Sequence, residues 1–447
     1  MGISSLKEKL KRYLKQALMN REVLRLAIPN IISNLSVPLL SAVDTILMGH
    51  ISSAHLAALG LASMMFVFLY GNFGFLRMGT TGITAQAYGQ EDDKLIANTL
   101  SRALIVAIMI ALPLMLFQSQ IFSVAAYLMN VEVSYHDKVT AYFDIRIYTA
   151  PAVFFQYAIF GWFFGMQNAT YPLIITLFIN IVNIVLSYYF VNTLGLGIEG
   201  AAYGTLIAQY AGVGLSLIMI LKYKGLLKNI TYHDSFQKSH FYRFISVNKD
   251  IFIRTVALTF VLAFFYSQSA KEGEQTLSIM ILLLQFLIWS SFAMDGFANA
   301  AESLVGKYYG AKDWVQFRKA IRYSFYWAGG FALFFTLVYY FGGRTILELY
   351  TNQSELIEQA MPFMFLVAVM PLLSFTAFIW DGVFIGMTAS KSMRNAVILS
   401  MLLFLVVFYL TKEINYAWAL WSSFILFFVF RGGIQTWMFW KQGRGLS

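Results

Sequence analysis

About twelve apolar stretches, each long enough to cross a lipid bilayer, follow one another along this 447-residue chain. A helix needs roughly 20 predominantly apolar residues to span the hydrocarbon core. Only 12% of the residues are charged, whereas about a quarter are charged in a typical soluble protein. Alternation at the period of a strand is absent, which argues against a membrane β-barrel. The expected spans are 23–48, 56–87, 95–117, 139–163, 172–193, 198–222, 247–270, 276–305, 318–342, 356–387, 392–411 and 415–439. The long ones must tilt, kink or extend beyond the hydrocarbon.

The net charge of +10 is concentrated in a few connections between these spans. Lysines and arginines cluster before the first span, after the sixth and after the eighth, which share one side of the membrane if there are twelve spans. The connections on the opposite side offer only Lys138, Lys271, Arg344 and Lys412. By the positive-inside rule, both termini are expected in the cytoplasm. The basic excess therefore indicates orientation, and no nucleic-acid partner is expected.

The first residues allow two interpretations. Residues 3–18 place Ile3 and several leucines on one side of a helix, with lysines elsewhere. This pattern suits a helix lying on the cytoplasmic leaflet, and a solvated basic tail explains the composition equally well. No short apolar region with a small-residue cleavage site is present, so no removable signal peptide is expected. The chain has no cysteine, which excludes disulfides and thiolate metal sites.

Two short motifs recur at one offset of 221 residues. The pairs are Tyr88-Gly89-x-x-Asp92 with Tyr309-Gly310-x-x-Asp313, and Gly161-x-Phe163-x-Gly165-Met166 with Gly382-x-Phe384-x-Gly386-Met387. Six spans per copy is an even number, so the copies share an orientation. The predicted fold is an all-α polytopic membrane protein with two six-helix lobes, related by a pseudo-two-fold axis along the membrane normal. The expected segments are an N-terminus at 1–22, an N-lobe at 23–222, a linker at 223–246, a C-lobe at 247–440 and a tail at 441–447.

Asp44 is a carboxylate within the first span. A charge at a helix centre costs about 2.5–3.5 kcal/mol on insertion scales, so such a residue is by default a functional-site hypothesis. Pro29 and Pro38 interrupt the same span and predict kinks, because proline lacks an N–H and clashes with the carbonyl four residues back. A kinked helix that carries a charge suits an element with two arrangements, although such prolines also simply bend membrane helices.

Polar residues from three other spans are expected near this carboxylate. They are Tyr142, Arg146 and Gln156 on the fourth span, Asn180, Asn183 and Ser187 on the fifth, and Thr205 on the sixth. Their oxygens could form a cation shell, with Na⁺ held by Asp44, Asn183 and Thr205, or a hydrogen-bond cage for a protonatable aspartate. The alternative is a structural role, in which these side chains only form hydrogen bonds between neighbouring helices. Arg146 is expected to pair with Asp144 or a helix end, and Gln156 is a further candidate for lining a cavity.

The 221-residue offset pairs these polar positions with apolar ones in the second half. Asp44 maps onto Phe265, and the other partners are Phe363, Val367, Met401, Phe404, Phe408 and Leu426. Ion coupling is therefore expected in the first lobe alone. In the second half, Asp295 either lines the cavity or anchors a conformational lock with Arg254 or Asp381.

Four stretches of the sequence carry a resemblance to a known family. They are Ile28-Pro29-Asn30 with Val43-Asp44-Thr45, Ile145-Arg146 before Ala150-Pro151, Asn180 to Ser187 leading into Gly195–Gly200, and Asp295 to Gly306. On these stretches the chain resembles the multidrug and toxic compound extrusion (MATE) transporters, specifically the DinF-type branch. The resemblance covers nearly the whole chain. It implies a two-lobe antiporter that exports amphipathic, often cationic compounds in exchange for protons or sodium.

The resemblance also implies roles for individual residues. It places the essential acid at Asp44 and a bending proline at Pro29. The positions implied to surround the acid are Tyr142, Asn180, Asn183 and Thr205. Where the family pattern usually has a second carboxylate on the fifth helix, this chain has Ser187. A single carboxylate supplies less charge for sodium, so proton coupling is favoured, and no cofactor is expected besides the transported ion.

Other functions are compatible with a chain of this class. A lipid-linked oligosaccharide or lipid flippase of the same wider superfamily is the main alternative. It would be expected to show extra helices or a cluster of cavity arginines, but only Arg77, Arg146 and Arg254 lie near membrane depth. An enzyme is disfavoured, because the inventory of catalytic groups is poor. A passive channel is disfavoured by the duplicated lobes. The expected partners are small amphipathic substrates and membrane lipids, and the expected state is a monomer.

Overall fold

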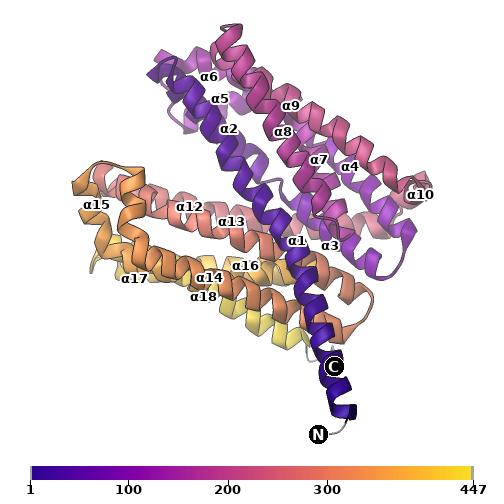
Figure 1. The fold of residues 1–447 in the computed structure, drawn as a ribbon. Coiled ribbons are helices and arrows are strands. Elements are labelled where there is room, and N and C mark those ends of the chain that lie inside the picture. The colour runs from indigo at the N-terminus through magenta and orange to yellow at the C-terminus, as the bar shows by residue number, and fades with distance from the viewer. Residues whose placement is uncertain (1–2, 444–447) are drawn as a thin grey trace. The chain divides into compact units, whose positions relative to one another are not determined.

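The computed structural model describes residues 3–443, with the side chains in that range except those of 3–17, 39, 40, 232, 442 and 443. Within this range the chain is almost wholly helical and contains no strand (Figure 1). Twelve helical segments in this part are long and apolar enough to cross a membrane, which confirms the predicted all-α class and each expected span. The amphipathic face expected on residues 3–18 falls almost entirely outside the described side chains, and most of the tail at 441–447 lies outside the described residues.

The helices cover the predicted spans, although the seventh begins at Lys238, nine residues before the expected 247, and the ninth ends at Tyr350, eight residues after the expected 342. The first half contains α1 (Ile3–Gly49), α2 (Ser53–Gly71), α3 (Phe75–Gly89), α4 (Asp93–Leu116), α5 (Gln118–Leu128), α6 (Val133–Arg146), α7 (Ala150–Gly165), α8 (Thr170–Tyr188), α9 (Gly197–Ile220), α10 (Lys224–Leu227) and α11 (Tyr232–Ser235). The second half contains α12 (Lys238–Lys271), α13 (Glu274–Gly310), α14 (Trp314–Tyr350), α15 (Ser354–Ala360), α16 (Met364–Gly386), α17 (Ser390–Thr411) and α18 (Tyr416–Gly443).

The chain divides into two compact units. The N unit comprises Ile32–Asn248, and the C unit comprises the described residues up to Ile31 together with those from Lys249 onward. Both divisions fall inside helices, α1 and α12, instead of in the polar linker at 223–246. The part of α1 up to Ile31 is therefore counted with the C unit, whereas the predicted boundaries assign that helix from residue 23 onward to the N-lobe.

The Tyr-Gly-x-x-Asp motif ends one helix and begins the next in both units. Asp92 accepts a hydrogen bond from the Leu95 amide at 2.9 Å, and Asp313 accepts one from the Gln316 amide at 3.0 Å. Each aspartate therefore caps the exposed amides at a helix N-terminus. The preceding residue is left-handed in both copies, with φ of 56° at Glu91 and also at Lys312. The two copies of the motif thus share a backbone turn as well as residue types.

The second repeated motif lets two helices approach closely in each unit. A Cβ on Gly161 of α7 would collide with the Arg77 carbonyl of α3, and one on Gly382 of α16 would collide with the Ala298 carbonyl of α13. Because Arg77 and Ala298 are themselves one repeat apart, the same helix pair packs in the same register in both units. These contacts require glycine, since any side chain would force the backbones apart.

The long second span and the proline-bearing first span behave differently. The second span is broken between α2 and α3, where the three residues 72–74 lie outside the helices. The second span is therefore interrupted, whereas α13 and α14, with 37 residues each, are continuous. The first span continues without a break through Pro29 and Pro38. Their role as hinges therefore remains a prediction about a second state.

Candidate functional site

Asp44 lies near the Gly49 end of α1, in the N unit, and its side chain is buried at 8% exposure. One carboxylate oxygen, Oδ1, is buried and has no hydrogen-bond partner among the described residues. The side chains that interact with the carboxylate are the Ser187 hydroxyl, through a hydrogen bond, and the Arg146 guanidinium, through its charge. A buried carboxylate oxygen without a hydrogen-bond partner can accept a proton or interact with a small cation.

A short hydrogen-bonded chain leads away from this acid through α8 and α9. The Ser187 hydroxyl lies 3.5 Å from Oδ1 of Asn183, and Nδ2 of Asn183 donates to the Thr205 hydroxyl at 2.9 Å. Thr205 in turn donates to the Ala201 carbonyl of its own helix at 3.1 Å. Residues 183, 187 and 205 are all buried. The structure therefore joins Asp44 to three of the side chains that the sequence places near it.

Tyr142 and Arg146 form the wall of the site on α6. The Arg146 guanidinium donates a hydrogen bond to the Tyr142 hydroxyl and lies over the Phe66 ring, 5.1 Å from its centroid. Of the two partners expected for Arg146, Asp144 is exposed and forms no ion pair with it among the described residues, whereas pairing with a helix end stays a prediction. A helix places residues four apart on one face. Tyr142 and Arg146 consequently lie on one face of α6, and Arg146 interacts with Asp44 through its charge, whereas Asp144 is exposed.

Two other predicted residues make contacts outside this chain. Asn180 donates to the Ser36 hydroxyl of α1 at 2.9 Å, so it joins α8 to α1 away from the acid. Gln156 donates to the backbone carbonyl of Gln209 at 3.0 Å, which joins α7 to α9. Both bonds are of the kind that holds membrane helices together. Nothing in the sequence pattern distinguishes them from the residues that reach Asp44.

The corresponding region of the C unit is filled by aromatic rings. Phe265, which the repeat pairs with Asp44, is fully buried and lies 5.2 Å from Trp421 and 4.7 Å from Phe424 by ring centroids. Phe404 and Phe408, paired with Asn183 and Ser187, are buried in the same cluster. The C unit thus packs an apolar core at the place where the N unit holds its polar network.

The C unit has a polar cluster of its own, built on α12, α16 and α18. Asp381 forms ion pairs with Arg254 and Arg431, and its Oδ1 accepts a hydrogen bond from Gln435 at 2.6 Å. Asp295 interacts with Arg431 through its charge. Of the suggested lock partners, Arg254 and Asp381 are therefore in direct contact, and Asp295 belongs to the same group of charges.

Arg431 and Gln435 are residues that the sequence reasoning missed. Both are buried, and they lie one turn apart on α18. The expectation that only Arg77, Arg146 and Arg254 lie near membrane depth is wrong, since Arg431 is buried within the last span. The sequence signal that could have identified Arg431 is a single arginine inside the apolar stretch of the last span. The arginine count therefore no longer argues against a flippase, although Asp381 balances part of the charge.

Asn30 is a further case in which the partner was not expected. The Asn299 amide of α13 donates to its Oδ1 at 3.2 Å, within the C unit. Its own amide donates to the Leu26 carbonyl at 2.8 Å. Two polar residues of α1 therefore belong to different units, Asn30 to the C unit and Asp44 to the N unit.

The comparison with known proteins covers most of the chain. The sequence profile of the MatE family matches residues 29–189 and 251–410. The chain belongs to the MatE family. DNA damage-inducible protein F of Escherichia coli is 32% identical over 415 residues, which cover 91% of this chain and 89% of that protein. This similarity confirms the DinF-type resemblance. A probable multidrug resistance protein, NorM of Acinetobacter baylyi, is 25% identical over 354 residues, 76% of this chain and 77% of NorM. This MatE protein is thus a multi-pass membrane transporter.

Solved structures support the fold of this MatE transporter at low sequence identity. A MATE protein crystallised in a bent conformation superposes with a TM-score of 0.86 at 18% identity, and covers 97% of this chain and 98% of its own. A MATE transporter of Vibrio cholerae in a bent form gives 0.84 at 17% identity, and covers 96% and 98%. At such identities the likeness establishes the fold and carries no information on individual site residues.

Proposed function

We propose that this MatE transporter is a secondary active multidrug antiporter. It exports amphipathic, often cationic compounds in exchange for protons, or alternatively sodium, by alternating access, with Asp44 as the coupling residue. Family membership and the names of the relatives support export of toxic compounds. The duplicated halves support alternating access, because repeats of this kind are used to rock two bundles about a site between two states.

The observation that carries the proposal is the state of the Asp44 carboxylate. It is buried, one of its oxygens has no hydrogen-bond partner among the described residues, and Arg146 is the basic group that interacts with it. A charge in such a place is costly unless it is neutralised by a proton, a cation or a partner. Asp44 can therefore respond to the arrival of an ion, whereas its counterpart Phe265 cannot.

Ser187 supports a way of transmitting that response. Its hydroxyl has one hydrogen but two neighbouring acceptors, the Asp44 carboxylate and Oδ1 of Asn183. When Asp44 is ionised, the hydrogen is best used on the carboxylate, since bonds to charged acceptors are stronger. When Asp44 is protonated, the hydroxyl can accept from the acid and donate to Asn183. Protonation would thus reorder the chain that leads to Thr205 on α9.

Proton coupling is favoured over sodium coupling because the site contains few negatively charged groups. The described residues contain no cluster of three acidic or histidine side chains suited to a metal ion. A sodium ion would rely on Asp44 and on neutral oxygens of Asn183 and Thr205, with Arg146 close by. Hard cations are bound by several oxygen ligands and are repelled by a neighbouring positive charge.

The test is efflux of ethidium from proteoliposomes with an imposed proton gradient, or with a sodium gradient at clamped pH. Asp44→Asn should abolish ethidium transport against its gradient, and Asp295→Asn should only slow it. Uphill transport by Asp44→Asn at the wild-type rate would overturn the coupling assignment. Equal losses in the two variants would remove the proposed asymmetry between the units. Efflux driven by a sodium gradient alone would show that the coupling ion is sodium and not the proton.

Membrane orientation and the second candidate function need separate tests. We infer that both termini are cytoplasmic, that the protein resides in a bacterial inner membrane and that it works as a monomer. Because the chain has no cysteine, a single cysteine at Lys228 should be labelled only from the cytoplasmic side. A flippase is favoured by the buried Arg254 and Arg431 alone. Translocation of a fluorescent lipid-linked sugar by wild type, without ethidium efflux, would establish it instead.

A further inference from the structure

A polar cavity of about 470 Å³ lies in the N unit. Its walls come from the start of α2, from α6 and from the connection that leads into α9. The volume lies within the range of ligand pockets, roughly 300–1,000 Å³. The side chains in the lining that are charged or can take up a proton are His55, Asp137, Lys138 and Glu199. Because water binds to such groups, a hydrated ion can enter this N-unit cavity.

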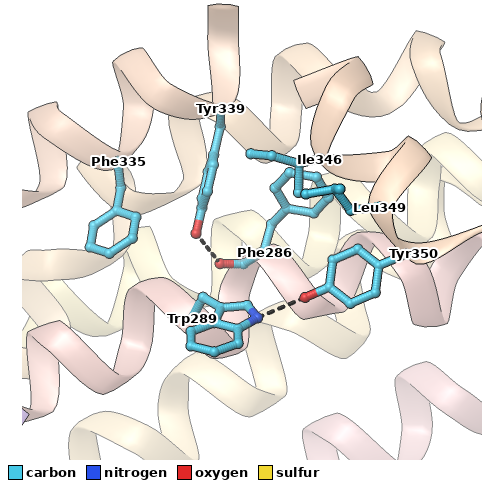
Figure 2. Close-up of a pocket in the computed structure, with 7 residues that line it drawn as sticks. All are labelled: Phe286, Trp289, Phe335, Tyr339, Ile346, Leu349 and Tyr350. Atoms are coloured by element: carbon cyan, nitrogen blue, oxygen red, sulfur yellow. Dashed lines mark hydrogen bonds between the residues drawn. The ribbon is translucent and has the colours of Figure 1, made fainter. Parts of the chain in front are cut away.

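A cavity between α13 and α14 of the C unit has a different lining (Figure 2). The Trp289 indole donates to the Tyr350 hydroxyl at 2.7 Å, and the Tyr339 hydroxyl donates to the Phe286 carbonyl at 2.8 Å. No charged side chain lines this second cavity. An apolar wall offers an ion nothing in place of its hydration. Of the two cavities, the one in the N unit therefore suits an ion.

The connection between α8 and α9 forms one wall of the N-unit cavity through two left-handed glycines. Their φ angles are 67° at Gly195 and 57° at Gly197. A Cβ on Gly197 would lie 3.4 Å from Nε2 of His55, so the backbone of this connection runs beside the imidazole. The other ring nitrogen, Nδ1, lies 2.8 Å from the Ser52 hydroxyl at the start of α2. His55 is therefore held between α2 and this connection, at the wall of the cavity.

The α6 helix carries both the cavity and a wall of the Asp44 site. Ala141 lines the cavity, and the next residue, Tyr142, accepts a hydrogen bond from Arg146. Arg146 in turn interacts with Asp44 through its charge. Arg146 is only about 8 Å beyond Ala141 along the helix, given a rise of 1.5 Å per residue. A short stretch of one helix thus joins the cavity to the acid.

The same relation holds on α9 and α1. Ile198 lines the cavity, and Thr205, the last side chain of the hydrogen-bonded chain that begins at Asp44, lies about 10 Å further along α9. On α1, Asp44 is about 8 Å from Gly49, where the helix ends and the connection to α2 begins. The cavity and the acid therefore lie at the same end of the N unit, roughly two helical turns apart.

An apolar layer separates the cavity from the acid. Ile198 belongs to a buried cluster that also contains Leu47 and Met48 of α1, which are 8% and 0% exposed. These two residues follow Asp44 by one helical turn, on the side of the cavity. Apolar constrictions of this kind stop ions while they are dry and pass them when water enters. The layer therefore closes the way to Asp44 in this state of the protein.

The N-unit cavity lies at the end of the N unit opposite the linker. Gly197 at the cavity begins α9, and Ile220 ends this helix just before the linker. The 24 residues of α9 extend over about 36 Å, which exceeds the hydrocarbon thickness of about 30 Å. Because the linker and both termini are inferred to be cytoplasmic, the cavity opens towards the outside of the cell. Protons that drive export enter from that side.

We propose that the N-unit cavity is the outer vestibule through which the coupling ion reaches Asp44. The ion enters among the polar side chains of the lining, crosses the layer of Met48 and Ile198 when that layer is hydrated, and binds to the carboxylate. The proposal rests on the coupling role proposed for Asp44. It adds the route of the ion and the side from which it comes.

The test is the rate at which a thiol at position 44 reacts with methanethiosulfonate ethyltrimethylammonium, a membrane-impermeant cation, added outside spheroplasts. The chain has no cysteine, so Asp44→Cys provides a single target, and the reading by mass spectrometry of the purified chain needs no transport activity. Leu196→Trp, combined with Asp44→Cys, should fill the cavity. Leu194→Trp is the matched control, since Leu194 does not line the cavity and is 51% exposed, against 41% for Leu196. Ala141→Trp is a second filling variant, from α6, and size-exclusion profiles identify folded variants.

Asp44→Cys alone and with Leu194→Trp should react at the same rate. With Leu196→Trp or Ala141→Trp the reaction should be about tenfold slower, because a filled cavity leaves little space wider than a water molecule. Equal rates in all four proteins would overturn the proposal, since the reagent would then arrive by another route. A thiol at position 44 that is not labelled from outside would overturn it as well. Failure of the proposed function is a separate result, a lack of ion-driven ethidium efflux by the unsubstituted chain, whatever the labelling rates.

Discussion

Replacing Asp381 with asparagine removes a carboxylate that two buried arginines share in the C unit. Arg254 and Arg431 both form ion pairs with Asp381, and all three residues are buried. Removing one partner of a buried pair costs about 3–5 kcal/mol, because it leaves an uncompensated charge in a medium that solvates it poorly. Asp295 still balances part of the charge on Arg431. We therefore expect Asp381→Asn to lower the free energy of unfolding by about 3–5 kcal/mol.

The assay is reversible unfolding in mixed micelles with increasing sodium dodecyl sulfate, followed by tryptophan fluorescence. Glu358→Gln is the matched control, since it also removes a carboxylate from an arginine, at 2.7 Å, but on the exposed surface. Solvent screens such pairs, so this variant should behave like wild type. The double variant Asp381→Asn/Arg431→Gln should recover part of the loss, because it removes one of the stranded charges.

The result that would refute this reasoning is a small effect of Asp381→Asn. A change below about 1 kcal/mol would mean that the arginines are hydrated or can rotate to other partners. A double variant less stable than Asp381→Asn alone would also contradict it, since the cost would then come from lost packing and not from charge. Either outcome would remove the basis for regarding this cluster as a lock that holds α12, α16 and α18 together.

Three further predictions follow from local geometry. Gly382→Ala should destabilise the protein by about 1–3 kcal/mol in the same unfolding assay, because the added Cβ overlaps a backbone carbonyl of α13. Ser187→Ala should slow proton-driven ethidium efflux by about tenfold, since the acid loses the hydroxyl that links it to α9. Thr231→Val should raise the pKa of Asp234, whose carboxylate now accepts the Thr231 hydroxyl at 2.7 Å, a bond that holds this pKa below its ordinary value. Titration of ¹³C-labelled aspartate by NMR measures that change.

Controls and contrary outcomes differ among the three. Gly330→Ala has open space for its Cβ, so it should be neutral or slightly stabilising, and an equal loss would refute the clash. Ser216→Ala removes a buried hydroxyl that bonds to its own helix at 2.7 Å. If Ser216→Ala slows efflux as much as Ser187→Ala does, the slowing is not specific to the hydroxyl beside Asp44. The Asp234 contact stabilises its loop at neutral pH and loses that effect as pH falls through the lowered pKa. An unchanged titration in Thr231→Val would exclude the hydroxyl as the cause.

The sequence predicts the helical framework well because its signals are local. Apolar length specifies each span, and the Asp92 and Asp313 motif specifies a cap that uses only neighbouring amides. The repeated glycines also indicate close helix contacts from the sequence alone, since such a contact requires the absence of a side chain. The same offset identifies Phe265 as the apolar counterpart of Asp44, and the ring cluster around it agrees.

The candidate site could be predicted only in part. Periodicity places Asn180 and Asn183 on one face of α8, but Asn180 bonds to Ser36 while Asn183 bonds to Thr205. The choice depends on which neighbouring helix each position meets, and that depends on helix rotation and tilt. The partnership of Asp381 with Arg431 is another example, since the two residues are fifty positions apart in the chain.

By itself, the sequence determined how many helices are long and apolar enough to cross the membrane, about where they lie, that two motifs recur at one offset, and that Asp44 has an apolar counterpart in the second half. These properties follow from hydrophobic length and from contacts between residues a few positions apart, which the chain order contains. Tertiary structure alone decided which side chains meet: Ser187 with Asp44, Arg431 with Asp381, and the rings of α13 and α14 around an open cavity. Helices of one length and polarity can pack in many rotations, and only the sum of their interhelical contacts selects one.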